Sequence, residues 1–174
     1  MSPARLFDRP LLRQAFDLLA AKLARRQVVG ELHVFGGAAM VLAFDARAAT
    51  RDVDALFQPD GPVLEAAREV ADELGLPASW HNQASSYVSG RAGRGTPVYD
   101  HPNLRVMTTP PEHLLAMEVR AARAVRDAED IRLLLEVLNL HTMQEVVEVV
   151  ARYFPDEPLS DRSRQLVEDL LAEQ

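Results

Sequence analysis

This chain of 174 residues contains no cysteine, few aromatic residues and no long apolar run. The absence of cysteine excludes disulfide bonds and thiolate zinc sites, and it fits a cytoplasmic location. No segment approaches the roughly 20 apolar residues of a membrane-spanning helix, so we expect no membrane partner. The opening residues, MSPARLFDRP, lack the apolar core of a signal peptide. The remaining composition, 48% hydrophobic and 26% charged, is that of an ordinary folded domain.

Positive charge is also in short supply. The chain has 19 Lys and Arg against 26 Asp and Glu, which gives a net charge of −7. This balance disfavours a broad nucleic-acid-binding surface, so any nucleic acid would have to meet a local basic patch. The five histidines show no metal-ligand spacing, and the sequence has no motif of a zinc or serine hydrolase.

Apolar periodicity predicts five helices around a few strands, which is an α+β fold with a helical bundle in its C-terminal half. We expect residues 1–109 to form an α/β core with an N-terminal helix, and residues 110–174 to form a helical region packed on the same domain. Within the irregular segment 76–101, the polar run 83–89 fits a short helix or a loop. The predicted helices cover residues 9–27, 63–74, 113–125, 142–154 and 160–172; the one at 113–125 leads into residues 126–131, and residues 133–138 continue a buried face. Helix starts are predicted at Asp8 before Pro10, at Thr109 before Pro110, and at Thr142 with Glu145 as a capping box, and residues 58–62 are predicted to form a turn.

The segment from residue 31 to residue 57 organises the chain. An apolar strand at residues 32–35 ends abruptly at Gly36-Gly37, and a helix of small residues follows directly. Glycine lets a ligand approach the backbone closely, and the free N–H groups at the start of a helix favour a phosphate. The simpler interpretation of the two glycines is a strand-to-helix turn.

Residues 50–57 alternate between polar and apolar, which is the period of a strand with one buried face. In this strand Asp52 and Asp54 project from the same face, while Val53 points into the core. Two neighbouring carboxylates on a rigid strand repel each other unless a cation lies between them. A hard cation such as Mg²⁺ takes oxygen ligands. The alternative is a pair of solvated carboxylates.

The order of strand, Gly-Gly, short helix and Asp-x-Asp strand resembles the core signature of the nucleotidyltransferase superfamily. This superfamily includes DNA polymerase β-like enzymes and AbiEii-type toxins. Residues 111–118 (PEHLLAME) and 126–131 (RDAEDI) are similar to the "LLAxK" helix and the "RDxxD" element of these toxins. Trp80-His81-Asn82 resembles a tryptophan–asparagine element of small members. Together the matched stretches span about residues 30–140.

The resemblance implies a small mixed sheet with flanking helices. It also implies Mg²⁺-dependent transfer of a nucleotide from a nucleoside triphosphate to an acceptor hydroxyl. In the toxin members the acceptor can be tRNA or a protein. The implied partners are therefore a nucleoside triphosphate, a tRNA or protein acceptor, and the cognate antitoxin of a toxin–antitoxin pair.

Asp52 and Asp54 are the predicted metal ligands and catalytic carboxylates. Asp127 and Asp130 are further catalytic candidates, as a third carboxylate or as the general base for the acceptor hydroxyl. Alternatively, Asp127 caps the next helix and Asp130 supports the same turn. The predicted nucleotide-binding residues are Gly36, Gly37, Thr50, Arg51, Arg91, Arg94, Glu118 and Arg123.

Several of the arginines have two interpretations. Arg91 and Arg94 lie in the glycine-rich segment 89–95, which is either a flexible solvated loop or a basic loop that pairs with phosphate oxygens. Arg120, Arg123 and Arg126 recur every three residues. They form either a phosphate-binding stripe or a solvated face that pairs with nearby carboxylates.

Glu118 departs from the resemblance, because such proteins usually carry a lysine at this position. A lysine would neutralise the triphosphate, whereas a glutamate would repel it or serve as an extra metal ligand. Arg120 does not replace the lysine, since two positions further along is about 200° around the helix axis. Two functions follow: an active nucleotidyltransferase, or a catalytically impaired one that acts by binding a protein or nucleic-acid partner.

Overall fold

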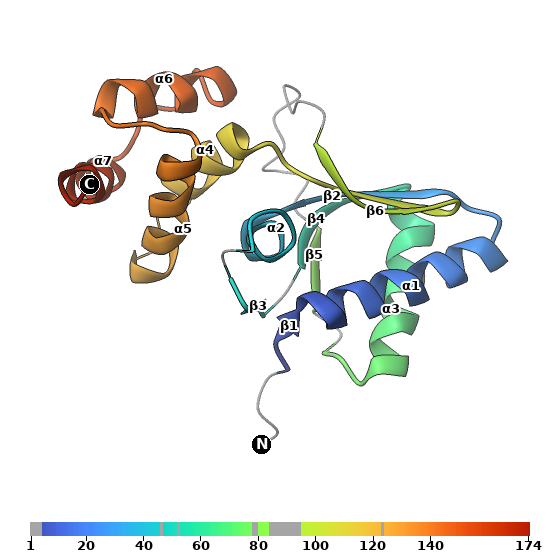
Figure 1. Cartoon of the computed structure of the whole chain (residues 1–174). Coiled ribbons are helices and arrows are strands. Elements are labelled where there is room, and N and C mark those ends of the chain that lie inside the picture. The colour runs from blue at the N-terminus through green and yellow to red at the C-terminus, as the bar shows by residue number, and fades with distance from the viewer. Residues whose placement is uncertain (1–4, 46, 52, 78–79, 84–94, 123) are drawn as a thin grey trace. The chain divides into compact units, whose positions relative to one another are not determined.

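The computed structural model describes residues 5–45, 47–51, 53–77, 80–83, 95–122 and 124–174. Within these residues the protein forms seven helices and two sheets of mixed strand orientation, which confirms the α+β class (Figure 1). The chain divides into two compact units, of which the first ends at Thr109 and the second begins at Pro110. None of the helices in the described part of the chain has the length and apolar character that crossing a bilayer needs.

The first unit combines three helices with all the described strands. The helices are α1 (Arg9–Arg25), α2 (Gly36–Ala43) and α3 (Asp60–Leu74). The strands are β1 (Phe7–Asp8), β2 (Gly30–Phe35), β3 (Ala49–Thr50), β4 (Val53–Gln58), β5 (His81–Gln83), β6 (Thr96–His101) and β7 (Leu104–Thr108). The larger sheet has the order β5-β4-β2-β7-β6, and β1 pairs with β3 in a separate ribbon.

Strand directions in the larger sheet are mixed, as the resemblance implies. β2 lies at its centre, antiparallel to β4 and parallel to β7. β5 runs parallel to β4, and β6 runs antiparallel to β7. The connection from β2 through α2 to β4 therefore reverses the chain, and it brings the end of β2 next to the start of β4.

The N-terminal helix α1 starts as its sequence predicts. The Asp8 side chain accepts a hydrogen bond of 2.9 Å from the N–H of Leu11, and Pro10 lies in the first turn. Both features favour a helix start here. The carboxylate accepts from a backbone N–H that has no partner within the helix, and proline has no N–H that would need a partner. The apolar stripe that includes Phe16 and Leu19 is fully buried.

Helices α1 and α3 lie side by side and cover one face of the larger sheet (Figure 1). A Cβ added to Gly30 would lie 2.7 Å from Leu23 Cδ1 of α1 and 3.2 Å from Val63 Cγ2 of α3, so β2 touches both helices. Successive strand residues point to opposite faces. Phe35, five positions after Gly30, and its partner Asp54 therefore project from the opposite face of the sheet.

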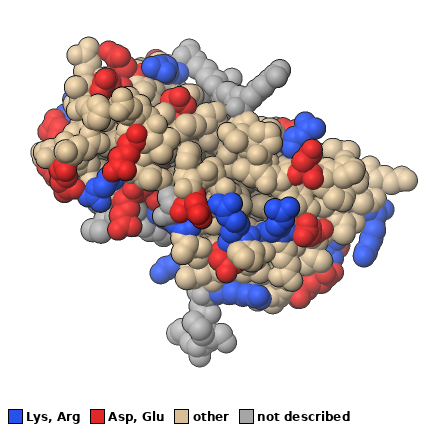
Figure 2. Space-filling model, in the orientation of Figure 1, with Lys and Arg blue, Asp and Glu red and all other residues tan. Residues whose placement is uncertain are grey.

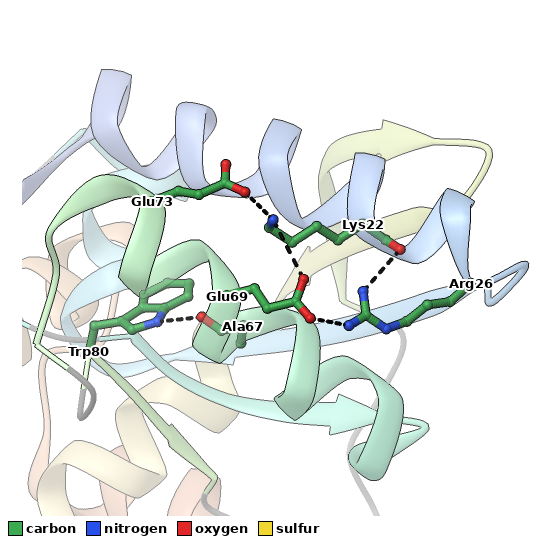
Figure 3. Close-up of polar contacts among 6 residues, drawn as sticks. All are labelled: Lys22, Arg26, Ala67, Glu69, Glu73 and Trp80. Atoms are coloured by element: carbon green, nitrogen blue, oxygen red, sulfur yellow. Dashed lines mark hydrogen bonds and ion pairs between the residues drawn. The ribbon is translucent and has the colours of Figure 1, made fainter.

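Charged side chains join α1 to α3 (Figure 3). Lys22, which is 5% exposed, forms ion pairs with Glu69 and Glu73 of α3. Arg26 donates to Glu69 and, at 3.3 Å, to the carbonyl of Lys22. The hydrogen bond from Arg26 lowers the pKa of Glu69 below its ordinary value. The cluster keeps a nearly buried ammonium group paired where the two helices meet.

Trp80 is a core residue of the first unit. Its indole Nε1 donates to the carbonyl of Ala67 in α3 at 3.1 Å (Figure 3). Its ring stacks on Phe7 of β1, with 5.7 Å between the centroids. The tryptophan thus links β1 and α3, and its backbone carbonyl accepts from the N–H of Val53 at the start of β4.

Three details of the first unit differ from the sequence-based expectation. Thr50 is not part of the Asp-x-Asp strand but pairs with Phe7 in the β1–β3 ribbon. Helix α3 begins at Asp60, so the predicted turn at residues 58–62 shares its end with the first helical turn. Residues 96–101, expected to be irregular, form β6. The pairing of Thr50 with Phe7 joins residues far apart in sequence, which a local pattern does not reveal.

The second unit consists of four helices, α4 (Pro111–Ala121), α5 (Ala124–Val137), α6 (Met143–Tyr153) and α7 (Asp161–Ala172). The predicted capping box at α6 is confirmed, because Thr142 Oγ1 accepts from the N–H of Glu145 at 3.3 Å and the Glu145 carboxylate accepts from the N–H of Thr142 at 2.9 Å. Ser160 caps α7 by accepting from the N–H of Ser163 at 3.1 Å. Local side-chain chemistry therefore sets both helix starts.

Two predictions around α4 were wrong. The helix predicted at residues 113–125 ends earlier, at Ala121, and Ala122, which follows it, has a φ of 22° although neither glycine nor proline marks this position in the sequence. Thr109 does not cap α4, because Pro110 takes the cap position. The Thr109 hydroxyl instead donates to the carbonyl of Val34 at 3.1 Å, which continues the pairing between β7 and β2.

His113 lies in the core of the second unit and is 1% exposed. Its ring stacks on Tyr153 of α6, with 4.4 Å between centroids and 2° between ring planes. Neither ring nitrogen has a hydrogen-bond partner within the described part of the chain. Burial lowers the pKa of His113, so the ring is neutral at pH 7.

Candidate functional site

The candidate site begins where β2 ends and α2 starts. Helix α2 begins at Gly36, and the preceding Phe35 makes no side-chain hydrogen bond to the first turn. The first turn also contains no acidic residue. Backbone N–H groups at the start of a helix have no partner within the helix, and together with the helix dipole they favour an anion. The start of α2 therefore carries the partial positive charge that favours binding of a phosphate.

A carboxylate lies directly against Gly36. This residue adopts a φ of 60°, a left-handed conformation that favours glycine. A Cβ at Gly36 would lie 2.9 Å from Asp54 Oδ2. The contact follows from the pairing of Phe35 with Asp54 between β2 and β4, since paired residues project from the same face of a sheet. The structure thus brings together the half-buried Asp54 and Gly36, both predicted as site residues.

A hydroxyl and a guanidinium lie against Gly37. A Cβ there would lie 2.5 Å from Thr50 Oγ1 and 3.0 Å from Arg47 Nη1. Thr50 is 3% exposed and is held in place by its pairing with Phe7. Arg47 is half-buried and belongs to the segment that joins α2 to β3. Only glycine leaves room for both side chains, and Arg47, Thr50 and Asp54 each engage in further interactions.

The C-terminal end of α2 is held by Arg9 of α1. The Arg9 guanidinium donates to the carbonyl of Val41 at 2.9 Å and lies 3.5 Å from the carboxylate of Asp45. A cation at the C-terminal end of a helix is favourable, because the free carbonyls carry partial negative charge. Both ends of this short helix are therefore tied to the first unit.

The remaining predicted residues around this site are only partly described. Arg51 is described and exposed, next to Thr50. The backbone register places Asn82 of β5 beside Asp54 of β4. Four predicted site residues lie outside the described residues: Asp52, Arg91, Arg94 and Arg123.

The donor chemistry at Gly36 fits Mg²⁺. No group of three or more His, Asp or Glu side chains in the described part of the chain could hold a metal ion. Mg²⁺, however, commonly binds one or two protein carboxylates and takes its other ligands from water and phosphate. Asp54 supplies one such carboxylate beside the space that a Cβ at Gly36 would fill. Asp52 is the predicted second ligand.

The other predicted carboxylates belong to the second unit. Asp127 and Asp130 lie one turn apart on α5 and are 7% and 4% exposed. Since α5 begins at Ala124, Asp127 lies within the first turn rather than at the cap, and the helix dipole favours its charge there. Glu118 is half-buried on α4. All three residues engage in interactions of their own.

Arg120 is occupied within the second unit. Its guanidinium lies 3.9 Å from the centroid of the Phe154 ring and forms an ion pair with Glu157. A cation over an aromatic face is attracted by the ring quadrupole. These two contacts favour the structural interpretation of Arg120 over a phosphate-binding stripe.

Sequence reasoning missed Arg47. Arg47 stands three residues before Thr50, between the helix of small residues and the Asp-x-Asp strand. The available signal was a basic residue in the short link between the two predicted parts of the site. Its position against Gly37, however, depends on how this link folds back over α2.

Comparison with known proteins found no relative. No family model matches the chain, and neither a curated protein nor a solved structure matches it.

Proposed function

We propose that this protein binds a nucleoside triphosphate together with Mg²⁺ at Gly36, Gly37 and Asp54, and that it transfers the nucleotide to an acceptor hydroxyl. The supporting observation is that the Asp54 carboxylate lies against Gly36 at the start of α2, where Phe35 makes no side-chain cap. A phosphate bound at the start of α2 would lie close to the Asp54 carboxylate, and the two negative groups would repel each other. The arrangement therefore favours a divalent cation between the carboxylate and the phosphate.

Each residue has a stated part in this proposal. Asp54, with Asp52, holds Mg²⁺, which when bound supplies Lewis-acid stabilisation of phosphoryl charge. The backbone N–H groups at Gly36 and Gly37 donate to phosphate oxygens. The hydroxyl of Thr50, packed beside Gly37, adds a polar group to the same phosphate-binding site.

The acceptor is proposed to be a hydroxyl of an RNA such as tRNA, or of a protein. Residues 110–174 contain 14 Asp and Glu but only 7 Lys and Arg. Acidic side chains predominate over the C-terminal helices on the face drawn in Figure 2. Such a surface repels phosphate, so an RNA acceptor would have to bind elsewhere. A cytoplasmic location and a cognate antitoxin belong to the same proposal.

The second candidate function is a protein that keeps this site architecture but works by binding a partner without catalysis. Glu118, where the proteins that this sequence resembles usually carry a lysine, favours it, because a carboxylate does not neutralise a triphosphate. Turnover of a nucleoside triphosphate in the presence of any RNA or protein acceptor would exclude this second candidate.

Thermal unfolding with each nucleoside triphosphate, with and without Mg²⁺, tests the first proposal. A ligand at 100 times its Kd stabilises the folded state by about 2.7 kcal/mol, so a clear rise in Tm is expected only when both are present. Asp54→Asn should abolish the rise. Asp100→Asn is the matched control, since this side chain is 78% exposed on β6. No rise with any nucleotide would contradict the proposal.

A further inference from the structure

The proposed site needs more positive charge than a single divalent cation provides. A triphosphate carries several negative charges, and Glu118 stands where a lysine is expected to balance them. We propose that Arg47 supplies this charge, by binding the phosphates that are not transferred. This inference rests on the proposed function and adds a residue from the first unit to it.

The two glycines lie against groups of opposite charge, so the two ends of a bound triphosphate would meet different side chains. The Gly36 backbone lies against a carboxylate, with Asp54 Oδ2 2.9 Å from the position of a Cβ. The Gly37 backbone lies against a cation, with Arg47 Nη1 3.0 Å from the position of a Cβ. Phosphates bridged to Asp54 by Mg²⁺ belong on the Gly36 side. The phosphates further along the triphosphate belong on the Gly37 side, where a guanidinium attracts them.

During transfer, negative charge would develop on the leaving pyrophosphate, which this proposal places next to Arg47. The acceptor oxygen forms a bond to the α-phosphorus, and the bond from this phosphorus to the oxygen that bridges to the β-phosphate breaks. The electron pair of the broken bond stays on the departing pyrophosphate, and the proton of the acceptor hydroxyl passes to solvent. Negative charge therefore grows on the leaving group, and a guanidinium placed there stabilises the transition state more than the ground state.

The environment of Arg47 suits this role. A guanidinium presents a planar fork of donors that matches two phosphate oxygens, and it stays charged at any relevant pH. The segment that carries Arg47 is short, and it is anchored at Thr50 by the pairing with Phe7. The side chain is half-buried, so fewer conformations are lost when it binds. The first unit thereby holds the phosphate-binding cation by itself.

Binding of Mg²⁺–triphosphate, Mg²⁺–pyrophosphate and nucleoside monophosphate, measured by isothermal titration calorimetry, tests the proposal. Arg47→Gln should weaken binding of triphosphate and pyrophosphate by about tenfold or more, as expected for a lost hydrogen bond between charged groups. Monophosphate binding should stay unchanged. Arg47→Lys keeps the charge but loses the fork, so its loss should be smaller. Arg68→Gln, an exposed change of the same charge on α3, should bind like the unmodified protein.

The outcomes separate this inference from the proposed function. If the unmodified protein binds triphosphate and Arg47→Gln binds it and pyrophosphate equally well, Arg47 has no such role and the proposed function stands. If the unmodified protein binds neither ligand with Mg²⁺, the proposed function fails and the role of Arg47 fails with it. Should Arg47→Gln not fold, Arg47→Lys decides, because undiminished pyrophosphate affinity in this variant would contradict a paired guanidinium.

Discussion

The two units of the chain use their charged residues differently. Residues 1–109 contain 12 Lys and Arg and 12 Asp and Glu, whereas residues 110–174 contain 7 and 14, so the whole net charge of −7 resides in the second region. In the first unit, three different polar side chains lie against two consecutive glycines. In the second, as at Asp8 and Lys22 of the first, charged and hydroxyl side chains cap helices and form ion pairs, which Thr142 and Arg120 illustrate.

This difference shows what makes a set of polar residues a candidate site. A capping box or an ion pair between helices satisfies its own donors and acceptors and stabilises the fold. The side chains gathered against two glycines at the end of a central strand lie where ligands commonly bind in sheet proteins. The net charge alone would place a candidate site in the acidic second unit, whereas the contacts of the two glycines place it in the first unit.

The largest expected effect comes from deleting a buried leucine in each unit. Leu32→Ala in β2 and Leu115→Ala in α4 remove fully buried side chains, and each should cost about 2–5 kcal/mol of unfolding free energy. Hydrogen exchange should rise mainly in the strands for Leu32→Ala and mainly in α4–α7 for Leu115→Ala. An equal rise throughout the chain in both variants would show that the units unfold as one, which would break the comparison.

The glycine pair should be more sensitive than a glycine elsewhere in the first unit. Gly37→Ala would force Thr50 or Arg47 to move, so we expect a loss of about 1–3 kcal/mol and of triphosphate binding. Gly61→Ala is the matched control in the first turn of α3, where a Cβ would meet no atom within 4 Å. It should be neutral or stabilise by up to about 1 kcal/mol. Equal Tm values for the two variants in thermal melts would contradict this expectation.

The second unit should lose stability in mild acid because of His113. Burial lowers the pKa of His113 in the folded state below its ordinary value of 6.5, so between these two pKa values the unfolded chain binds more protons. The free energy of unfolding should therefore fall as the pH drops below about 6.5, until the pH reaches the lowered pKa. His113→Phe keeps the stacking on Tyr153 and should flatten this dependence in urea melts at pH 5 and 7. An identical pH dependence in both proteins would rule out His113 as the cause.

The smallest effect is expected from Glu118→Lys. If Arg47 in the first unit supplies the phosphate-binding charge, a lysine at position 118 should change triphosphate affinity by less than about fivefold, in the range of a partly exposed ion pair. Calorimetric titration of the variant measures this directly. A much larger gain in affinity would contradict the assignment of the phosphate-binding charge to Arg47. It would also contradict the contrast drawn above between the charged residues of the two units.

Much of the fold could be predicted because its signals are local. Asp8 with Pro10 marks the start of α1, and the capping box at Thr142 marks α6, since each lies within four residues of the groups that it satisfies. The alternation around Val53 predicts which face of β4 is buried. Where the partner was distant the prediction was wrong, as for Thr109, whose hydroxyl binds the carbonyl of Val34 rather than the start of α4.

The candidate site divides in the same way. The sequence by itself determined that Gly36-Gly37 and Asp54 would lie at the ends of neighbouring elements, because glycine and strand periodicity are properties of short segments. Only the tertiary structure decided that Asp54 meets Gly36 and that Arg47 and Thr50 meet Gly37. These contacts depend on the register of β2 against β4 and on the ribbon that holds β3 to Phe7. A shift of one residue in either pairing would turn the side chains to the other face, and no local sequence pattern records that choice.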